Sequence, residues 1–167
     1  MRLRPLFIAL TVTAATFALA SGLLQYAEGR GKAHSTDGRR ASFQFNVRKL
    51  TNGDGTRKSG TALYEIADSE TLDGVRIYMR ELRDITVDGN FARFEGPGSI
   101  RFRTVRGVVE QTGQVFAFAR DNRKPTGPIE PRDRIGVRFV ASEGNLTYGF
   151  EGNVMDGDAA VGRREQP

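Results

Sequence analysis

The chain has 167 residues, enough for one domain, with no cysteine, one histidine and a net charge of +5. The absence of cysteine excludes disulfides, thiolate nucleophiles and cysteine-based zinc sites. The excess of basic residues is small and scattered, so we expect no nucleic-acid partner.

Residues 1–20 have the pattern of a signal peptide. Arg2 and Arg4 supply a positive start, an uncharged apolar stretch follows, and Ala18 and Ala20 place small residues before Ser21. We therefore expect cleavage after Ala20 and a secreted or periplasmic protein without a transmembrane span. The alternative is an uncleaved anchor, because residues 6–24 are uncharged and just long enough to cross a bilayer.

Residues 21–40 predict a flexible linker, because they combine glycines and mixed charges without a periodic apolar pattern. The single histidine, His34, lies in this segment. A lone histidine in such a context predicts a solvated side chain with no catalytic or ligand role.

Residues 41–156 predict one all-β domain. Phe43, Phe45 and Val47 alternate with polar residues, which is typical of a strand with one buried face. Comparable runs follow at residues 59–68, 75–79, 85–87, 91–103, 114–120, 134–140 and 146–154. Asn-Gly and Asp-Gly turn signals separate several of them. The spacing predicts an antiparallel β-sandwich or flattened barrel of seven to nine short strands.

Three further expectations concern parts of this domain. We expect Phe45, Phe94, Phe118 and Phe139 to share one core, because each lies on the apolar face assigned to its run. Pro97 cannot donate to a strand ladder, so the Gly-Pro-Gly at residues 96–98 predicts an edge position or a corner between sheets. Residues 157–167 are polar and small, which predicts a disordered tail.

Four segments carry a family resemblance: residues 41–47, 60–64, 92–98 and 116–121. Together they resemble the small secreted bacterial β-domains called post-COAP domains. One departure is residues 122–125, Asn-Arg-Lys-Pro, which are more basic than the Asp-Gly-x-Pro-Gly turn usual in that family. The resemblance implies an exported β-domain of unassigned biochemical role and carries over no catalytic residue.

Two constellations are candidate sites. Asp121 and Asp133 bracket a proline-rich loop and either share a Ca²⁺ ion or each cap a turn. Four arginines surround the two acids, so we expect turn caps and no metal. A set of arginines predicts either a basic stripe for anionic polysaccharide or phospholipid headgroups, or, as we expect, cross-strand ion pairs with nearby glutamates. These arginines are Arg76, Arg80, Arg83, Arg93, Arg101, Arg103 and Arg106.

No catalytic motif or cofactor fingerprint is present, so we expect neither an enzyme nor a bound cofactor. The sequence indicates an exported, non-enzymatic binding or structural module. The partner is not identified by the sequence; a cell-envelope component or a surface glycan is a candidate, and no ligand-binding residue is assigned. The alternative is a small-molecule carrier with an apolar cavity inside a β-barrel.

Overall fold

The computed structural model describes residues 22–67, 73–122 and 132–166, so the expected signal peptide lies outside the described residues. These ranges form nine strands. They are β1 (Gly22–His34), β2 (Arg40–Asn52), β3 (Gly55–Ala67), β4 (Asp73–Met79), β5 (Asp84–Asp88), β6 (Phe91–Thr104), β7 (Gly107–Arg120), β8 (Arg134–Ala141) and β9 (Thr147–Gln166). Among the described residues, no helix is long and apolar enough to cross a membrane.

The strands form a closed antiparallel barrel. The sheet order is β4-β3-β2-β1-β9-β8-β7-β6-β5, and an additional pairing of β4 with β6 joins eight strands into a ring. Strand β5 pairs with the first part of β6 outside this ring. The expected all-β class is therefore confirmed, in its barrel form.

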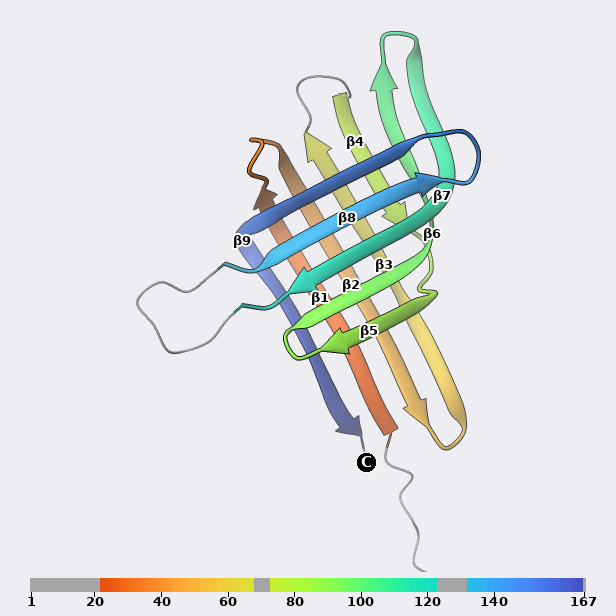
Figure 1. The fold of residues 1–167 in the computed structure, drawn as a ribbon, viewed down its shortest axis with the longest axis vertical. Helices are drawn as coiled ribbons and strands as arrows, with labels where there is room; N and C mark the ends of the chain where they lie inside the picture. Colours follow the sequence, from red (N-terminus) through yellow and green to blue (C-terminus); the bar gives the residue numbers. More distant parts are fainter. Residues whose placement is uncertain (1–21, 68–72, 123–131, 167) are drawn as a thin grey trace, which may run out of the picture.

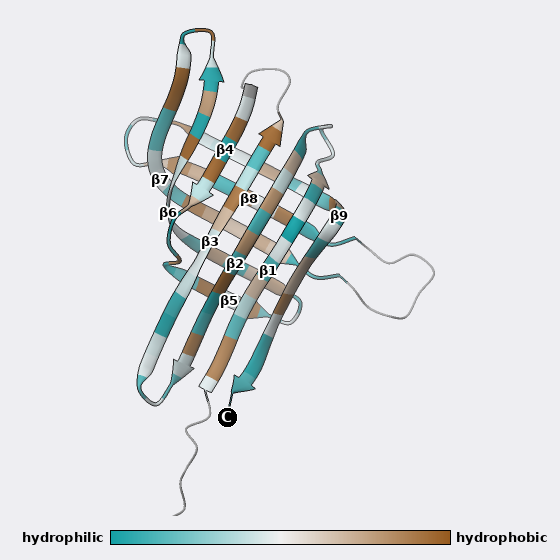
Figure 2. Ribbon diagram, turned by 180° about the vertical axis from the view of Figure 1, so that it is seen from behind, coloured by the Kyte–Doolittle hydropathy of each residue, from teal (hydrophilic) through white to brown (hydrophobic). Residues whose placement is uncertain are grey.

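The barrel is flattened into two layers whose strands cross steeply (Figure 1). The front layer contains β5, the first part of β6, the last part of β7, β8 and the first part of β9. The rear layer contains β1 to β4 with the remaining parts of β6, β7 and β9, and Figure 2 shows it from behind. This orthogonal arrangement needs strands that pass from one layer to the other.

Strand β6 makes one of these corners at its Gly-Pro-Gly sequence. Before the corner, Glu95 pairs with Asp84 of β5, and after it Gly98 pairs with Met79 of β4. Backbone from the β4 side approaches so closely that a Cβ at Gly96 would lie 1.9 Å from the carbonyl oxygen of Glu81. The expectation of a corner is confirmed, and the glycine is required by this close approach.

Strand β9 makes the other corner near residues 155–157. Its pairing with β1 shifts between Lys32 and Ala33, so that Met155 has no pairing partner in β1. Gly157 follows with φ +91, a conformation that side chains disfavour. The two halves of β9 can thus serve different layers.

Large side chains fill the interior between the layers. Phe45 and Phe94 are 2% exposed with ring centroids 5.3 Å apart, and Phe139 is fully buried. The core positions expected for these three rings are confirmed. Phe118 was wrongly placed, because Val115, Ala117 and Ala119 face the interior on β7.

Size explains this error in β7. The ring of Phe139 lies over Gly113, where an added Cβ would come within 2.7 Å of its Cζ atom. The large rings of neighbouring strands already fill the interior, so β7 supplies small residues there. The phenylalanines of β7 are therefore left for the outer surface.

The linker and tail expectations are wrong as well. Residues 22–34 are strand β1, and residues 157–166 are the end of β9. The two segments pair with each other, from Gly22 opposite Gln166 to Gly31 opposite Gly157. Their inward positions are small, as at Ala27 and Ala159, so their sequences lack the alternation of large apolar residues that reveals other strands.

Side chains from the rear layer hold the outer edge of β5. The Gln25 side-chain oxygen accepts the Val87 backbone N–H at 3.0 Å, and Arg163 donates to the Val87 carbonyl oxygen. Lys49 and Lys58 lie 3.0 and 3.2 Å from the carboxylate of Asp84. These contacts fix β5, and with it one margin of the front layer.

Candidate functional site

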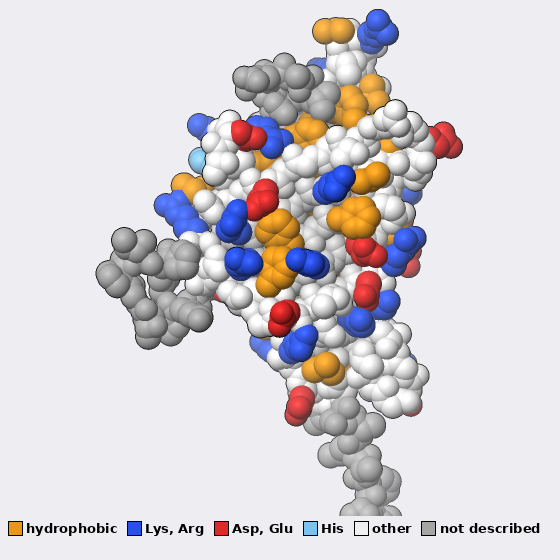
Figure 3. Space-filling view, in the orientation of Figure 1, with side chains coloured by type: hydrophobic (Ala, Val, Ile, Leu, Met, Phe, Trp, Pro, Cys, Tyr) orange, Lys and Arg blue, Asp and Glu red, His pale blue; other side chains and the backbone are white. Residues whose placement is uncertain are grey.

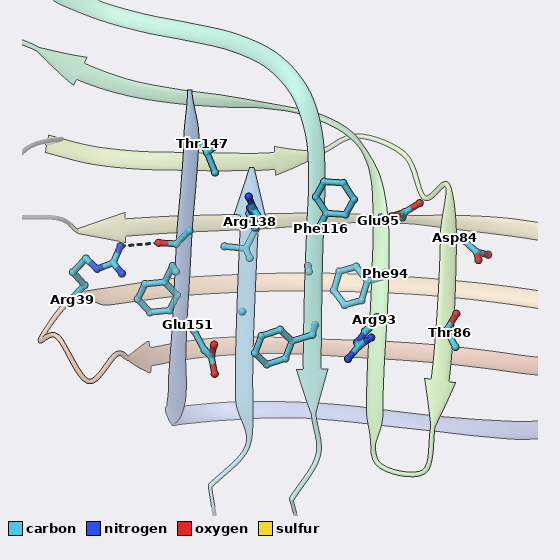
Figure 4. Close-up of a pocket in the computed structure, with 16 residues that line it drawn as sticks. Arg39, Asp84, Thr86, Arg93, Phe94, Glu95, Phe116, Arg138, Thr147 and Glu151 are labelled. Carbon is cyan, nitrogen blue, oxygen red and sulfur yellow. Dashed lines mark hydrogen bonds between the residues drawn. The ribbon is translucent and has the colours of Figure 1, made fainter. Parts of the chain in front are cut away.

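A shallow groove of about 750 Å³ lies on the outer surface of the front layer. Figure 3 shows hydrophobic side chains gathered on this face among basic and acidic ones. Strands β5 to β9 supply the groove floor, and Arg39 joins from the connection between β1 and β2. Figure 4 shows the side chains that line it.

The first row of the groove has an exposed aromatic ring between opposite charges. Phe116 of β7 is 42% exposed and lies directly opposite Arg138 of β8 on one side and Glu95 of β6 on the other. Directly opposite residues have Cβ atoms about 5 Å apart. The three residues therefore lie in one row across β6, β7 and β8, as Figure 4 shows.

The second row is built around a glycine. Phe118 is half-buried and lies opposite Gly136 of β8 and Arg93 of β6. An added Cβ at Gly136 would lie 2.2 Å from the Phe118 ring, so the ring packs directly on the glycine backbone. This packing keeps the ring low on the sheet and leaves the surface above it open.

Gly149 of β9 opens the groove beside Arg138, its pairing partner. A Cβ added there would meet only the Val137 carbonyl oxygen, at 3.8 Å, so the space above Gly149 is empty of protein atoms. A Cβ atom at this position would enter the groove without a steric clash.

Arg39 closes the β9 end of the groove. Its Nη1 donates to the Gly149 carbonyl oxygen at 2.9 Å and to the Tyr148 hydroxyl at 3.3 Å. Its Nε donates to Asp37 at 2.8 Å. Hydrogen bonds from Arg39 and Ser35 hold the pKa of Asp37 well below its usual value, and the Asp37 bond raises the pKa of Arg39. The Arg39 guanidinium is thus held in place by these hydrogen bonds and stays charged.

Most acids around the groove already have cationic partners. Glu151 pairs with Arg134, and Asp84 pairs with Lys49 and Lys58. Partial burial works to raise the pKa of Asp84, but the hydrogen bonds from the two lysines outweigh it and lower this pKa. Across the described residues, Glu95 is left without a cationic partner in a hydrogen bond or ion pair.

Two groove arginines form no ion pair with an acid among the described residues. Arg138 is exposed and forms no ion pair with the residues that the structure describes. Arg93 is exposed as well, and its guanidinium lies over the Phe91 ring, 5.2 Å from the centroid. Arg120 approaches the same ring at 5.1 Å. The groove therefore combines exposed ring surface with unneutralised positive charge.

The arginines considered as a stripe do not form one continuous surface. Arg76 pairs with Glu65, as expected for a cross-strand ion pair. Arg101 lies directly opposite Arg76, and these two line a second hollow with Arg103, beyond the β6 corner and apart from the groove. Arg93 alone among them lines the groove. The groove instead uses Arg39 and Arg138, which the sequence did not single out.

Asp133 links backbone segments that are far apart in the sequence. Its carboxylate accepts the backbone N–H of Asn122 at 2.8 Å and that of Ala159 at 3.1 Å, while its carbonyl oxygen accepts Val154 N–H at 2.8 Å. Asp133 thus joins the start of β8 to the corner of β9. Residues 123–131 of the intervening loop lie outside the described residues.

Two further expectations concern His34 and metal binding. His34 is the half-buried last residue of β1, opposite Arg40 and Asn153, so its expected place in a solvated linker is wrong. Within the part of the chain that the structure describes, no three His, Asp or Glu side chains gather in a way that could hold a metal ion.

Sequence reasoning missed the groove because it assigned the rings of β7 to the core. One signal was present: the run at residues 114–120 is apolar on both faces. A barrel strand with large rings on one face and small apolar residues on the other can turn either face toward the interior. Comparison with known proteins finds no match among protein-family models, curated proteins or solved structures.

Proposed function

We propose that this protein is an exported, non-enzymatic binding module whose ligand lies in the groove of the front layer. The observation that carries the proposal is Phe116, exposed between Arg138 and Glu95 in the same cross-strand row as the open space at Gly149. An aromatic ring with charged groups on both sides provides apolar contact together with orientation.

The filled interior supports a surface site over the carrier alternative. A carrier needs an apolar cavity between the layers, whereas Phe45, Phe94, Tyr64, Phe139 and Phe150 pack there with at most 3% exposure. The state of the groove carboxylates favours binding over catalysis. Hydrolysis of a glycosidic bond needs two cooperating carboxyl groups, but Glu151 and Asp84 are held by basic residues.

Export follows from the signal-peptide pattern, and the strand arrangement is compatible with it. Strand β1 begins at Gly22, so cleavage after Ala20 would leave all nine described strands intact. The N-terminus of protein recovered from the periplasm or medium should be Ser21. Recovery of the full chain in membranes would contradict the proposal of export. Kinship with post-COAP domains stays a prediction.

A panel of immobilised neutral and acidic polysaccharides tests the binding function. We expect retention of the protein on at least one polymer, and loss of retention for Gly149→Leu, which fills the groove without a backbone clash. Arg57→Ala is the control, because Arg57 is exposed on β3 in the rear layer. Failure to bind any polymer, or equal binding by Gly149→Leu, would refute the proposed function.

A further inference from the structure

The unneutralised charge in the groove identifies the chemical class of ligand. Arg138 and Arg93 have no acidic partner among the described residues, whereas Glu95 is the one groove acid without a cation there. Exposed guanidinium groups bind carboxylates in a bidentate geometry. A ligand with acidic groups would therefore complete contacts that the protein leaves open.

The register places these two arginines on opposite sides of the two rings. Arg138 lies beside Phe116 on β8, and Arg93 lies beside Phe118 on β6. The two arginines are two strands and about two residues apart, which gives a Cα separation of roughly 12 Å from standard sheet spacings. The Arg93 guanidinium lies over Phe91, on the side away from Arg138. A chain with repeated acidic groups can cross the rings and meet each arginine.

We propose that the groove binds an acidic polysaccharide, with sugar faces stacked on Phe116 and Phe118 and sugar carboxylates held by Arg138 and Arg93. This inference rests on the proposed binding function. Figure 4 shows the two arginines and Phe116 on the same exposed face, across strands β6, β7 and β8. Glu95 repels carboxylates and can accept sugar hydroxyls, so it directs the acidic group next to Phe116 toward Arg138.

The composition of the groove favours a polysaccharide over a protein partner. The centres of protein interfaces are depleted of charged residues and bury about 800 Å² per partner. Here the apolar surface is confined to a few rings, and charged side chains surround them.

The test uses purified protein and two polymers with the same backbone. Polygalacturonate carries a carboxylate on each sugar, whereas its fully methyl-esterified form is neutral. We expect titration calorimetry to show binding of polygalacturonate that weakens with salt and little binding of the ester. Arg138→Ala and Arg93→Ala should each lower the affinity about tenfold, the size of one charge-assisted contact. Glu95→Gln should raise it.

Controls separate binding from folding. All three substituted side chains are at least partly exposed, so each variant should keep the melting temperature of the wild type, and Arg57→Ala should keep its affinity. Equal binding of the ester, with loss of that binding in Phe116→Ala, would overturn the acidic class while preserving the groove as a binding site. Absence of binding to both polymers, or tighter binding of single-stranded DNA, would also overturn the inference.

Discussion

Asp133→Ala removes the acceptor that holds the corner of β9 against the start of β8. Two backbone N–H groups, those of Asn122 and Ala159, lose their bonds to the carboxylate. Hydrogen bonds to a charged group contribute about 1.5–3 kcal/mol each. The free energy of unfolding should therefore fall by about 3–5 kcal/mol, a large part of the stability of a typical domain. Asp133→Asn retains one acceptor and should lose less.

Urea unfolding followed by circular dichroism measures this loss, and the melting temperature should fall by roughly 10 °C in a domain of this size. Asp88→Ala is a matched control, because Asp88 is exposed at the end of β5. A loss below about 1 kcal/mol for Asp133→Ala would refute the structural role of this carboxylate. Addition of EDTA to the wild type should leave the melting temperature unchanged. A fall would instead indicate that the Asp121–Asp133 loop binds a cation.

Three further predictions concern the barrel itself. Tyr64→Phe should raise the free energy of unfolding by about 1 kcal/mol, because the fully buried hydroxyl has no hydrogen-bond partner among the described residues. Burial also raises the pKa of this hydroxyl. A loss of stability in urea unfolding would show that the hydroxyl does have a partner. Gly157→Ala should lower the free energy of unfolding by more than about 1 kcal/mol, which is roughly the cost of an unfavourable φ alone. The added Cβ would also lie 2.1 Å from the Arg30 carbonyl oxygen. An unchanged melting temperature would contradict this prediction. Because the pKa of Asp84 is lowered on folding, its contribution is present above the unfolded pKa of about 4 and lost as pH falls through the folded pKa. Asp84→Asn should therefore lose less stability than the wild type on acidification, and parallel pH profiles would refute the role of the two lysines.

Alternation of large apolar and polar residues is a reliable indicator where one strand face meets the interior. In β2, Phe43, Phe45 and Val47 are buried as expected, and β8 follows the same rule with Ile135 and Phe139. The period of two fixes the face of such a strand because its other face is polar. Strands of this kind are sufficient to predict the all-β class and most of the core from the sequence alone.

Strand β1 and the end of β9 could not be recognised by this rule. Gly29 sits so close to the Phe45 ring that an added Cβ would lie 2.8 Å from its Cζ atom. The inward side of β1 must therefore be small where the partner strand supplies a ring. Pairing between β1 and β9 depends on two segments at opposite ends of the sequence, and neither segment alone contains a signal for it.

The orientation of β7 links the error in the fold to the missed groove. Both faces of this strand are apolar, so the choice between Phe118 and Ala117 as the buried residue depends on the neighbouring strands. Gly136 supplies the deciding information: it lies opposite Phe118 in β8, and the glycine leaves a gap that the ring covers. If Phe116 and Phe118 faced inward, they would need space inside the barrel. Phe139 already occupies the space over Gly113 there. An outward glycine opposite an aromatic residue thus indicates a ring held flat on the sheet surface, where a ligand can stack on it.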